Sequence, residues 1–257
     1  KLLDTAKALE GMPRQASTHA CGVVITKDPV DTYVPLYVRD NQISTQYIMT
    51  TLEELGLLKM DFLGLRTLTV IQDTINLVKQ TRGIDVEFDK EMNDPKVYKL
   101  WQEGNSSGIF QFESQGMTNF MKELKPDCLE DIIAGVSLYR PGPMDQIPRY
   151  IKGKQNPGHN EYTHPALEPI LNVTYGCMVY QEQVMQIVRD LAGYSLGRAD
   201  LVRRAMGKKK LDVMAKEREV FINGQVDEDG NIVVPGCVRN GIDAASADKI
   251  FDEMAEF

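Results

Sequence analysis

Short apolar runs with alternating polar positions dominate the first sixty residues of the chain. Between residues 57 and 63 such a run carries Lys59 and Asp61 two positions apart. Successive side chains of a strand point to opposite faces, so these two charged residues are expected to share one face, with the apolar residues on the other. Strands are expected over residues 21–26, 33–38, 43–48 and 57–63, and short helices over 1–11 and 49–55.

After Gly64 the apolar period changes to three and four residues. Leu68, Ile71 and Val78 follow this spacing, which predicts an amphipathic helix that ends before Gly83. Further helices are expected over residues 95–103, 115–124, 127–138, 165–171, 179–192, 197–206, 210–223 and 244–257.

A turn sequence interrupts the helical half. Asp229-Gly230-Asn231 lies between apolar residues and predicts a small hairpin inserted near residues 226–236. The pattern as a whole predicts an α+β fold, in which a small sheet in residues 1–63 precedes a mostly helical domain in residues 64–257.

Composition narrows the class of protein. The 257 residues are 42% hydrophobic and 26% charged, as in soluble globular proteins, and no apolar run is long enough to span a membrane. The four cysteines are scattered without a Cys-x-x-Cys pair, which argues against a structural zinc site and favours free thiols in a reducing cytoplasm. Helical patterns at both ends lead us to expect a piece of a longer protein.

Asp61 is the first candidate for chemistry. An unpaired buried carboxylate is costly, so the charged face of its strand must meet solvent, a counter-charge or a metal ion. A carboxylate fixed on a strand suits metal-assisted phosphoryl chemistry. The alternative is an ordinary solvated face of a sheet.

A basic cluster stands out against the net charge of −8. Residues 198–218 hold eight basic and three acidic side chains, a local charge of +5, with Arg203 and Arg204 before a glycine and then Lys208. Arginine forks match phosphate oxygens and lysines add point charge. A solvated helix end with dipole-favoured bases is the alternative. The spacing of a phosphate-binding P-loop is absent.

Two smaller groups of residues are candidates for binding nucleic acid. Arg140 precedes a Pro-Gly-Pro turn, and Arg149 and Lys152 follow it, so these bases could line a nucleic-acid channel or decorate a structural turn. His19 follows Ser17-Thr18 in what could be a phosphate-contacting loop, although a lone histidine is more often structural. The glutamines in 179–185 could bond a base or satisfy the core.

Several segments together resemble a known family. They are Ser17–Ile25, Lys59–Leu68, Ile109–Ser114, Tyr139–Pro143, Tyr175–Gly176, Tyr180–Met185 and Arg203–Lys209. In this order and spacing they closely resemble the bacterial DNA polymerase III alpha subunit, the C-family of replicative polymerases.

The resemblance implies a fold and a set of site residues. It implies a nucleotidyltransferase-type palm, of which a small mixed sheet remains in this chain, followed by helical fingers. Asp61 would be the third catalytic aspartate and would help to hold the two Mg²⁺ ions. Lys59 would approach the triphosphate or primer end. Arg203, Arg204 and Lys208 would neutralise the triphosphate of the incoming deoxynucleotide, and Arg140 would lie near template or nucleotide.

The chain departs from the family pattern in its acidic residues. The family's other two aspartates form an Asp-x-Asp pair upstream of this segment, and none precedes Asp61 here. We therefore expect the isolated chain to be inactive and not to bind the Mg²⁺ ions by itself. The expected partners of the parent protein are primer–template DNA, nucleotide, its other domains, and the sliding clamp and other replisome subunits through regions outside this chain.

Two other function classes remain open. A non-catalytic helical module could bind nucleic acid or phosphate through residues 198–218, and it would depend on Arg203 and Arg204 rather than Asp61. A stand-alone metal-dependent phosphoesterase needs clustered carboxylates or histidines, and the three histidines lie far apart in sequence.

Overall fold

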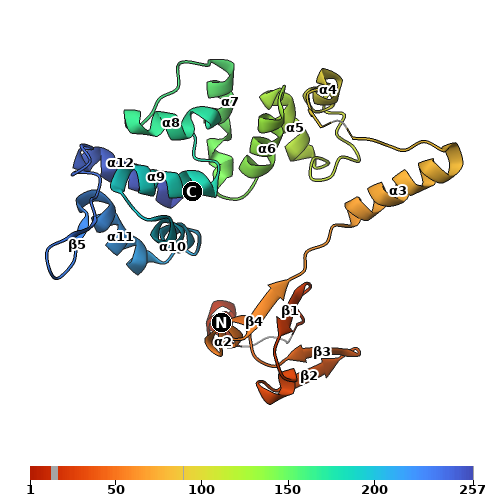
Figure 1. The fold of residues 1–257 in the computed structure, drawn as a ribbon, viewed down its shortest axis with the longest axis horizontal. Helices are drawn as coiled ribbons and strands as arrows, with labels where there is room; N and C mark the ends of the chain where they lie inside the picture. The colour runs from red at the N-terminus through yellow and green to blue at the C-terminus, as the bar shows by residue number, and fades with distance from the viewer. Residues whose placement is uncertain (13–16, 89, 257) are drawn as a thin grey trace. The chain divides into compact units, whose positions relative to one another are not determined.

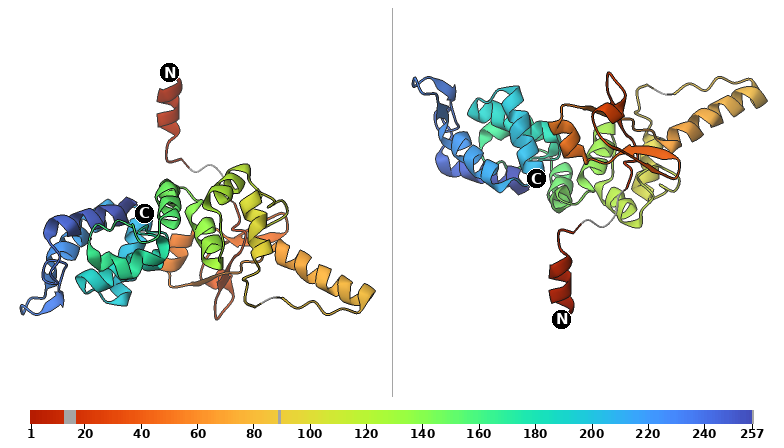
Figure 2. Two further views of the ribbon diagram at one scale, coloured as in Figure 1. Left: turned by 90° about the horizontal axis from the view of Figure 1, so that it is seen from above. Right: turned by 90° about the horizontal axis from the view of Figure 1, so that it is seen from below.

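The chain folds into two compact units, residues Lys1–Glu87 and Phe88–Phe257. The computed structural model describes residues 1–12, 17–88 and 90–256. Figures 1 and 2 show both units as ribbons, coloured along the chain from red at the N-terminus to blue at the C-terminus.

The first unit contains two antiparallel strand pairs and a few helices (Figure 1). Its elements are α1 (Leu2–Leu9), β1 (Gly22–Ile25), the 3₁₀ turn η1 (Val30–Thr32), β2 (Leu36–Arg39), β3 (Gln42–Thr45), α2 (Met49–Glu54), β4 (Leu58–Asp61) and α3 (Arg66–Arg82). Strand β1 pairs with β4, and β2 pairs with β3.

The predicted α+β class is confirmed, but the sheet differs from the expected mixed sheet. Both strand pairs are antiparallel and separate from each other. The turn between β2 and β3 explains one of them, because Asp40 and Asn41 adopt positive φ angles of 49° and 61°. Such a two-residue turn folds a strand directly back on its neighbour, whereas parallel pairing needs a long crossover.

The second unit is helical apart from one hairpin. Its longer helices are α4 (Pro95–Glu103), α5 (Gln115–Leu124), α6 (Leu129–Leu138), α7 (Ile147–Gln155), α9 (Gln181–Ala192), α10 (Leu196–Gly207), α11 (Leu211–Asn223) and α12 (Ala244–Glu256). Short helices η2 (Pro143–Gln146), η3 (Pro165–Leu167), α8 (Glu168–Leu171) and η4 (Asn172–Thr174) connect them. Helix α7 is absent from the sequence-based expectation, because prolines and scattered lysines obscure its period.

The predicted hairpin is present as β5 (Gln225–Val226) and β6 (Ile232–Val234), paired antiparallel with a register shift. Asp227 shapes its turn, since its carboxylate accepts the backbone N–H groups of Asp229 and Asn231 at 3.1 and 2.7 Å. Residues 227–229 form an Asp-x-Asp sequence downstream of Asp61, and its first carboxylate stabilises the hairpin turn.

Two hydrophobic clusters hold the second unit together. One is formed mainly by α9 to α12 and includes Phe221, Phe251 and Ile250, each almost fully buried. The other lies among α4 to α7 and includes Trp101 and Met121. Helix α3 of the first unit, in contrast, has no buried residue.

The division between the two units falls after Glu87, whereas the sequence pattern places a domain boundary after residue 63. That boundary stays a prediction. No helix in the described ranges is long and apolar enough to cross a membrane.

Candidate functional site

Strand β4 presents an acid and a base side by side. Lys59 and Asp61 share one face, as the alternation predicts, and Lys59 Nζ lies 2.6 Å from Asp61 Oδ1. The partner strand leaves room for this pair, because Gly22 lies opposite Asp61 and a Cβ there would come within 2.6 Å of Lys59 Cε. A side chain at position 22 would push the pair apart.

The ion pair fixes the charge state of Asp61. The hydrogen bond from Lys59 lowers the pKa of Asp61 below its ordinary value, and the charge of Lys59 acts in the same direction. Lys59 is 13% exposed and Asp61 is 47% exposed. The carboxylate is therefore ionised near neutral pH and its second oxygen is open to a ligand.

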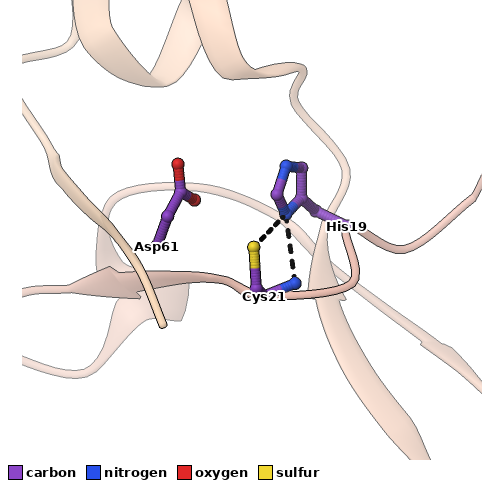
Figure 3. A group of neighbouring side chains, drawn as sticks. All are labelled: His19, Cys21 and Asp61. Carbon is purple, nitrogen blue, oxygen red and sulfur yellow. Dashed lines mark hydrogen bonds between the residues drawn. The ribbon is translucent and has the colours of Figure 1, made fainter. Parts of the chain in front are cut away.

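His19 lies beside this pair in the loop that leads into β1 (Figure 3). Its Nδ1 accepts backbone N–H groups from Gly22 at 2.8 Å and Cys21 at 3.2 Å, so the proton of the neutral ring sits on Nε2. A contact of 3.2 Å between the hydroxyls of Thr18 and Ser44 ties the loop to β3. The loop thus orients an N–H donor outward, although the sequence alone left His19 open to a purely structural role.

The residues around Asp61 do not by themselves form a magnesium site. A nitrogen of His19, the sulfur of Cys21 and an oxygen of Asp61 lie within 4.8 Å of one another. Magnesium prefers an octahedron of oxygens, and this group offers one carboxylate. The Nδ1 of His19 is moreover occupied by backbone donors. Asp61 fits as one ligand of such an ion but not as the whole site.

A groove of about 1150 Å³ opens beside Lys59 and His19 in the first unit. Tyr37 and Tyr47 contribute partly exposed rings to its wall, and Arg39 adds a positive charge. Aromatic faces and bases together suit a nucleic-acid strand, whose bases stack and whose phosphates are anionic.

The second unit carries a basic pocket of about 260 Å³. Three of the four residues expected to bind nucleotide line it, namely Arg203, Arg204 and Lys208, together with Gln181 from the start of α9. Apolar side chains from α9, α10 and α12 complete its wall. The fourth expected residue, Arg140, does not line this pocket, and its Nε donates to the carbonyl of Val136 at 3.3 Å.

Comparison with known proteins matches both halves of the chain. A family model of the bacterial DNA polymerase III alpha subunit finger domain matches residues 67–229, and one of the alpha NTPase domain matches residues 1–64. The chain belongs to the bacterial DNA polymerase III alpha subunit family. The resemblance read from the sequence motifs is thus confirmed.

Similar proteins named DNA polymerase III subunit alpha come from several organisms. The protein of Aquifex aeolicus is 50% identical over 88% of this chain and 20% of its own length. Those of Thermus aquaticus and Staphylococcus aureus (strain COL) are 46% and 45% identical, over 100% and 98% of this chain and 21% and 22% of theirs. The chain spans about a fifth of the length of these relatives.

One residue next to the basic pocket was not among the predicted site residues. Asp200, one turn before the arginines on α10, pairs with both, at 2.6 Å from Arg203 Nη2 and 2.8 Å from Arg204 Nε. The hydrogen bond from Arg203 lowers the pKa of Asp200, and Arg204 adds to the effect. The spacing of three and four residues on a predicted helix was the available signal.

The two glutamines of 179–185 have different roles. Gln183 is buried, its Oε1 accepts the N–H groups of Val179 and Tyr180, and its Nε2 donates to Thr174. Gln181 instead accepts from Arg203 Nη1 at 2.7 Å. Core satisfaction thus explains the first amide, and the pocket explains the second.

The other expected DNA contacts lie on α7. Arg149 Nη2 donates to the carbonyl of Glu161 at 2.9 Å, so part of its guanidinium serves the fold. Lys152 is exposed and pairs with no acidic side chain among the described residues. Neither residue lines the basic pocket.

A second group of potential metal ligands is already paired with a lysine. Asp127, Cys128 and Asp131 lie together, but the ammonium of Lys154 pairs with the two carboxylates at 2.8 and 2.7 Å. Burial raises the pKa of the Cys128 thiol to about 11, so it stays protonated. This group is a structural ion cluster between α6 and α7.

Proposed function

We propose that the chain is part of the palm and most of the fingers of a DNA-directed DNA polymerase, with residues 1–63 in the palm and residues 64–257 in the fingers. The parent protein would add deoxynucleotides to a primer 3′ end during chromosomal replication. The observation that carries the proposal is the Lys59–Asp61 pair, held on one strand face within a segment that the family model matches.

Asp61 is proposed as one of three carboxylates that bind two Mg²⁺ ions in the parent protein, with Lys59 close to the triphosphate or primer end. The two other carboxylates would come from an upstream Asp-x-Asp pair. Because this chain offers one suitable carboxylate at the site, it is expected to lack polymerase activity by itself.

The basic residues are proposed to bind the substrates. Arg203, Arg204 and Lys208 line one pocket and would neutralise the triphosphate of the incoming nucleotide. Arg140 would lie near template or nucleotide. The proposed contacts with primer–template DNA come from His19, Arg149 and Lys152, all three of which are exposed.

The decisive experiment uses the full-length parent polymerase. Asp61→Asn should lower primer extension with Mg²⁺ and four dNTPs by on the order of 10³-fold, because a metal ligand is lost while the shape of the strand is kept. DNA affinity should be nearly unchanged. Asp85→Asn, a carboxylate of the same unit that pairs with an exposed lysine, is the matched control.

A non-catalytic phosphate- or nucleic-acid-binding module is the second candidate, favoured by the basic pocket. If this second candidate is right, Asp61→Asn would leave the binding of nucleic acid or phosphate unchanged. Changes at Arg203 and Arg204 would abolish that binding and reduce its salt dependence. Templated extension by the purified 257-residue chain would contradict the expected inactivity of the chain.

A further inference from the structure

One carboxylate next to the basic pocket pairs with two of its arginines. Asp200 Oδ1 accepts from Arg203 Nε at 3.0 Å and from Arg203 Nη2 at 2.6 Å. Its other oxygen, Oδ2, lies 2.8 Å from Arg204 Nε. All three residues project from α10 at a spacing of three and four, which brings them to the same side of the helix.

These contacts leave donors free on both arginines. A guanidinium has five N–H groups. Arg203 directs three of them to Asp200 and Gln181, so one N–H remains on each terminal nitrogen. Arg204 contacts Asp200 through Nε, and its terminal nitrogens meet no other acceptor in the described part of the chain. Asp200 thus bonds part of each guanidinium and leaves the remaining N–H groups free to bind a phosphate.

Charge and geometry give opposite expectations for removing this carboxylate. Without Asp200 the pocket would gain one unit of positive charge, which by itself attracts a polyphosphate. Arg204 is 62% exposed, however, so added charge is screened by water and salt. Arg204 would lose its partner and Arg203 would keep only Gln181, so the ligand itself would have to order these long side chains, which costs affinity. We therefore expect the loss of preorganisation to outweigh the added charge, so that the affinity for a polyphosphate falls.

We propose that Asp200 is a positioning residue that orients Arg203 and Arg204 for the triphosphate of the nucleotide, with Gln181 as a second support from α9. The proposal rests on the proposed function of the two arginines as triphosphate ligands. Asp200 itself touches no substrate and acts through the two guanidiniums.

The test measures the affinity of inorganic tripolyphosphate for the 257-residue chain by calorimetry. Asp200→Asn should weaken binding about tenfold and Gln181→Ala about threefold, because each loosens a guanidinium. Asp200→Glu should recover most of the affinity. Asp248→Asn is the matched control, since it changes the net charge equally and removes an arginine partner on another helix, and it should leave binding unchanged.

A double-mutant cycle separates positioning from general structural damage. Lysines at positions 203 and 204 keep the charge but lack the fork, so Asp200→Asn in an Arg203→Lys/Arg204→Lys background should cost no further affinity. Tighter or equal binding by Asp200→Asn, or an undiminished loss in the lysine background, would overturn the proposal.

The same series of variants separates a failure of the Asp200 proposal from a failure of the proposed triphosphate site. If Arg203→Ala/Arg204→Ala binds tripolyphosphate as well as the unchanged chain, or if the unchanged chain does not bind it, the triphosphate site fails and the role of Asp200 fails with it. If the arginines are required and Asp200→Asn has no effect, the role of Asp200 alone is wrong.

Discussion

The two units differ in how many buried side chains support their candidate site residues. Within the described residues, Val34 and Leu52 are the buried apolar side chains of the first unit, and all the others belong to the second. The apolar face of the β1–β4 pair is open, with Leu58 58% and Met60 43% exposed. The acid–base pair of β4 therefore depends on few buried contacts, whereas the arginine pocket is built on helices with a closed core.

The largest expected effect lies in the core of the second unit. Phe251→Ala should lower the free energy of unfolding by about 3–5 kcal/mol, because it leaves a cavity in a fully packed cluster. Trp101, the one tryptophan of the chain, lies in this unit and reports its unfolding by fluorescence in urea. Ile43→Ala in the first unit, at a side chain 69% exposed, should change that value by less than about 0.5 kcal/mol. Equal losses would erase the contrast between the units.

A smaller effect is expected at the ion cluster of α6 and α7. Lys154→Met should cost about 2–3 kcal/mol, since it strands Asp131, which is 1% exposed, while Asp127 remains solvated. Lys152→Met on the same helix is the control and should be nearly neutral. The comparison uses the same fluorescence measurement.

The pH dependence of the Lys154 effect has a defined sign. The hydrogen bond from Lys154 lowers the pKa of Asp127, so its stabilisation is present above the ordinary value of 3.8 and is lost as the pH falls through the lowered pKa. Burial opposes the charge of Lys154, but Asp127 and Asp131 outweigh it and raise its pKa. That contribution is present below the ordinary value of 10.5 and is lost as the pH rises through the raised one. A gap between unchanged chain and variant that persists in strong acid would contradict this assignment.

The smallest expected effect concerns the first unit. Lys59→Met should raise the pKa of Asp61 toward its ordinary value of 3.8, because the hydrogen bond from Lys59 is the main cause of its lowering. The unfolding midpoint reported by Trp101 should not move. An NMR titration of the Asp61 carboxyl carbon measures the shift, and Lys79→Met, which removes an exposed pair with Asp85, should leave it unchanged.

Local patterns predicted most of the elements, and the exceptions have physical causes. Helices α3, α4 and α5 lie where apolar spacing and capping signals put them, with Gly83 and Gly104 at positive φ beyond the ends of α3 and α4. Helix α7 was not predicted, because its scattered lysines and Gly153 inside it weaken the apolar period. The expected mixed sheet was wrong because strand direction depends on pairing rather than on composition.

The candidate site was predicted in part. Alternation placed Lys59 and Asp61 on one face, and the run of bases pointed to Arg203, Arg204 and Lys208. No sequence pattern groups Gln181 with those bases, since they lie on different helices. Asp200 was counted only as one acid among the bases, although it pairs with Arg203.

By itself, the sequence determined the fold class, the family and the shared strand face of Lys59 and Asp61, because these follow from residue type and from spacing along one strand. Only the tertiary structure decided that Gln181 of α9 accepts a hydrogen bond from Arg203 of α10, and that Gln183 satisfies the core instead. The reason is that hydrogen bonds between separate elements depend on how those elements pack, and packing is a property of the whole folded unit rather than of any local stretch.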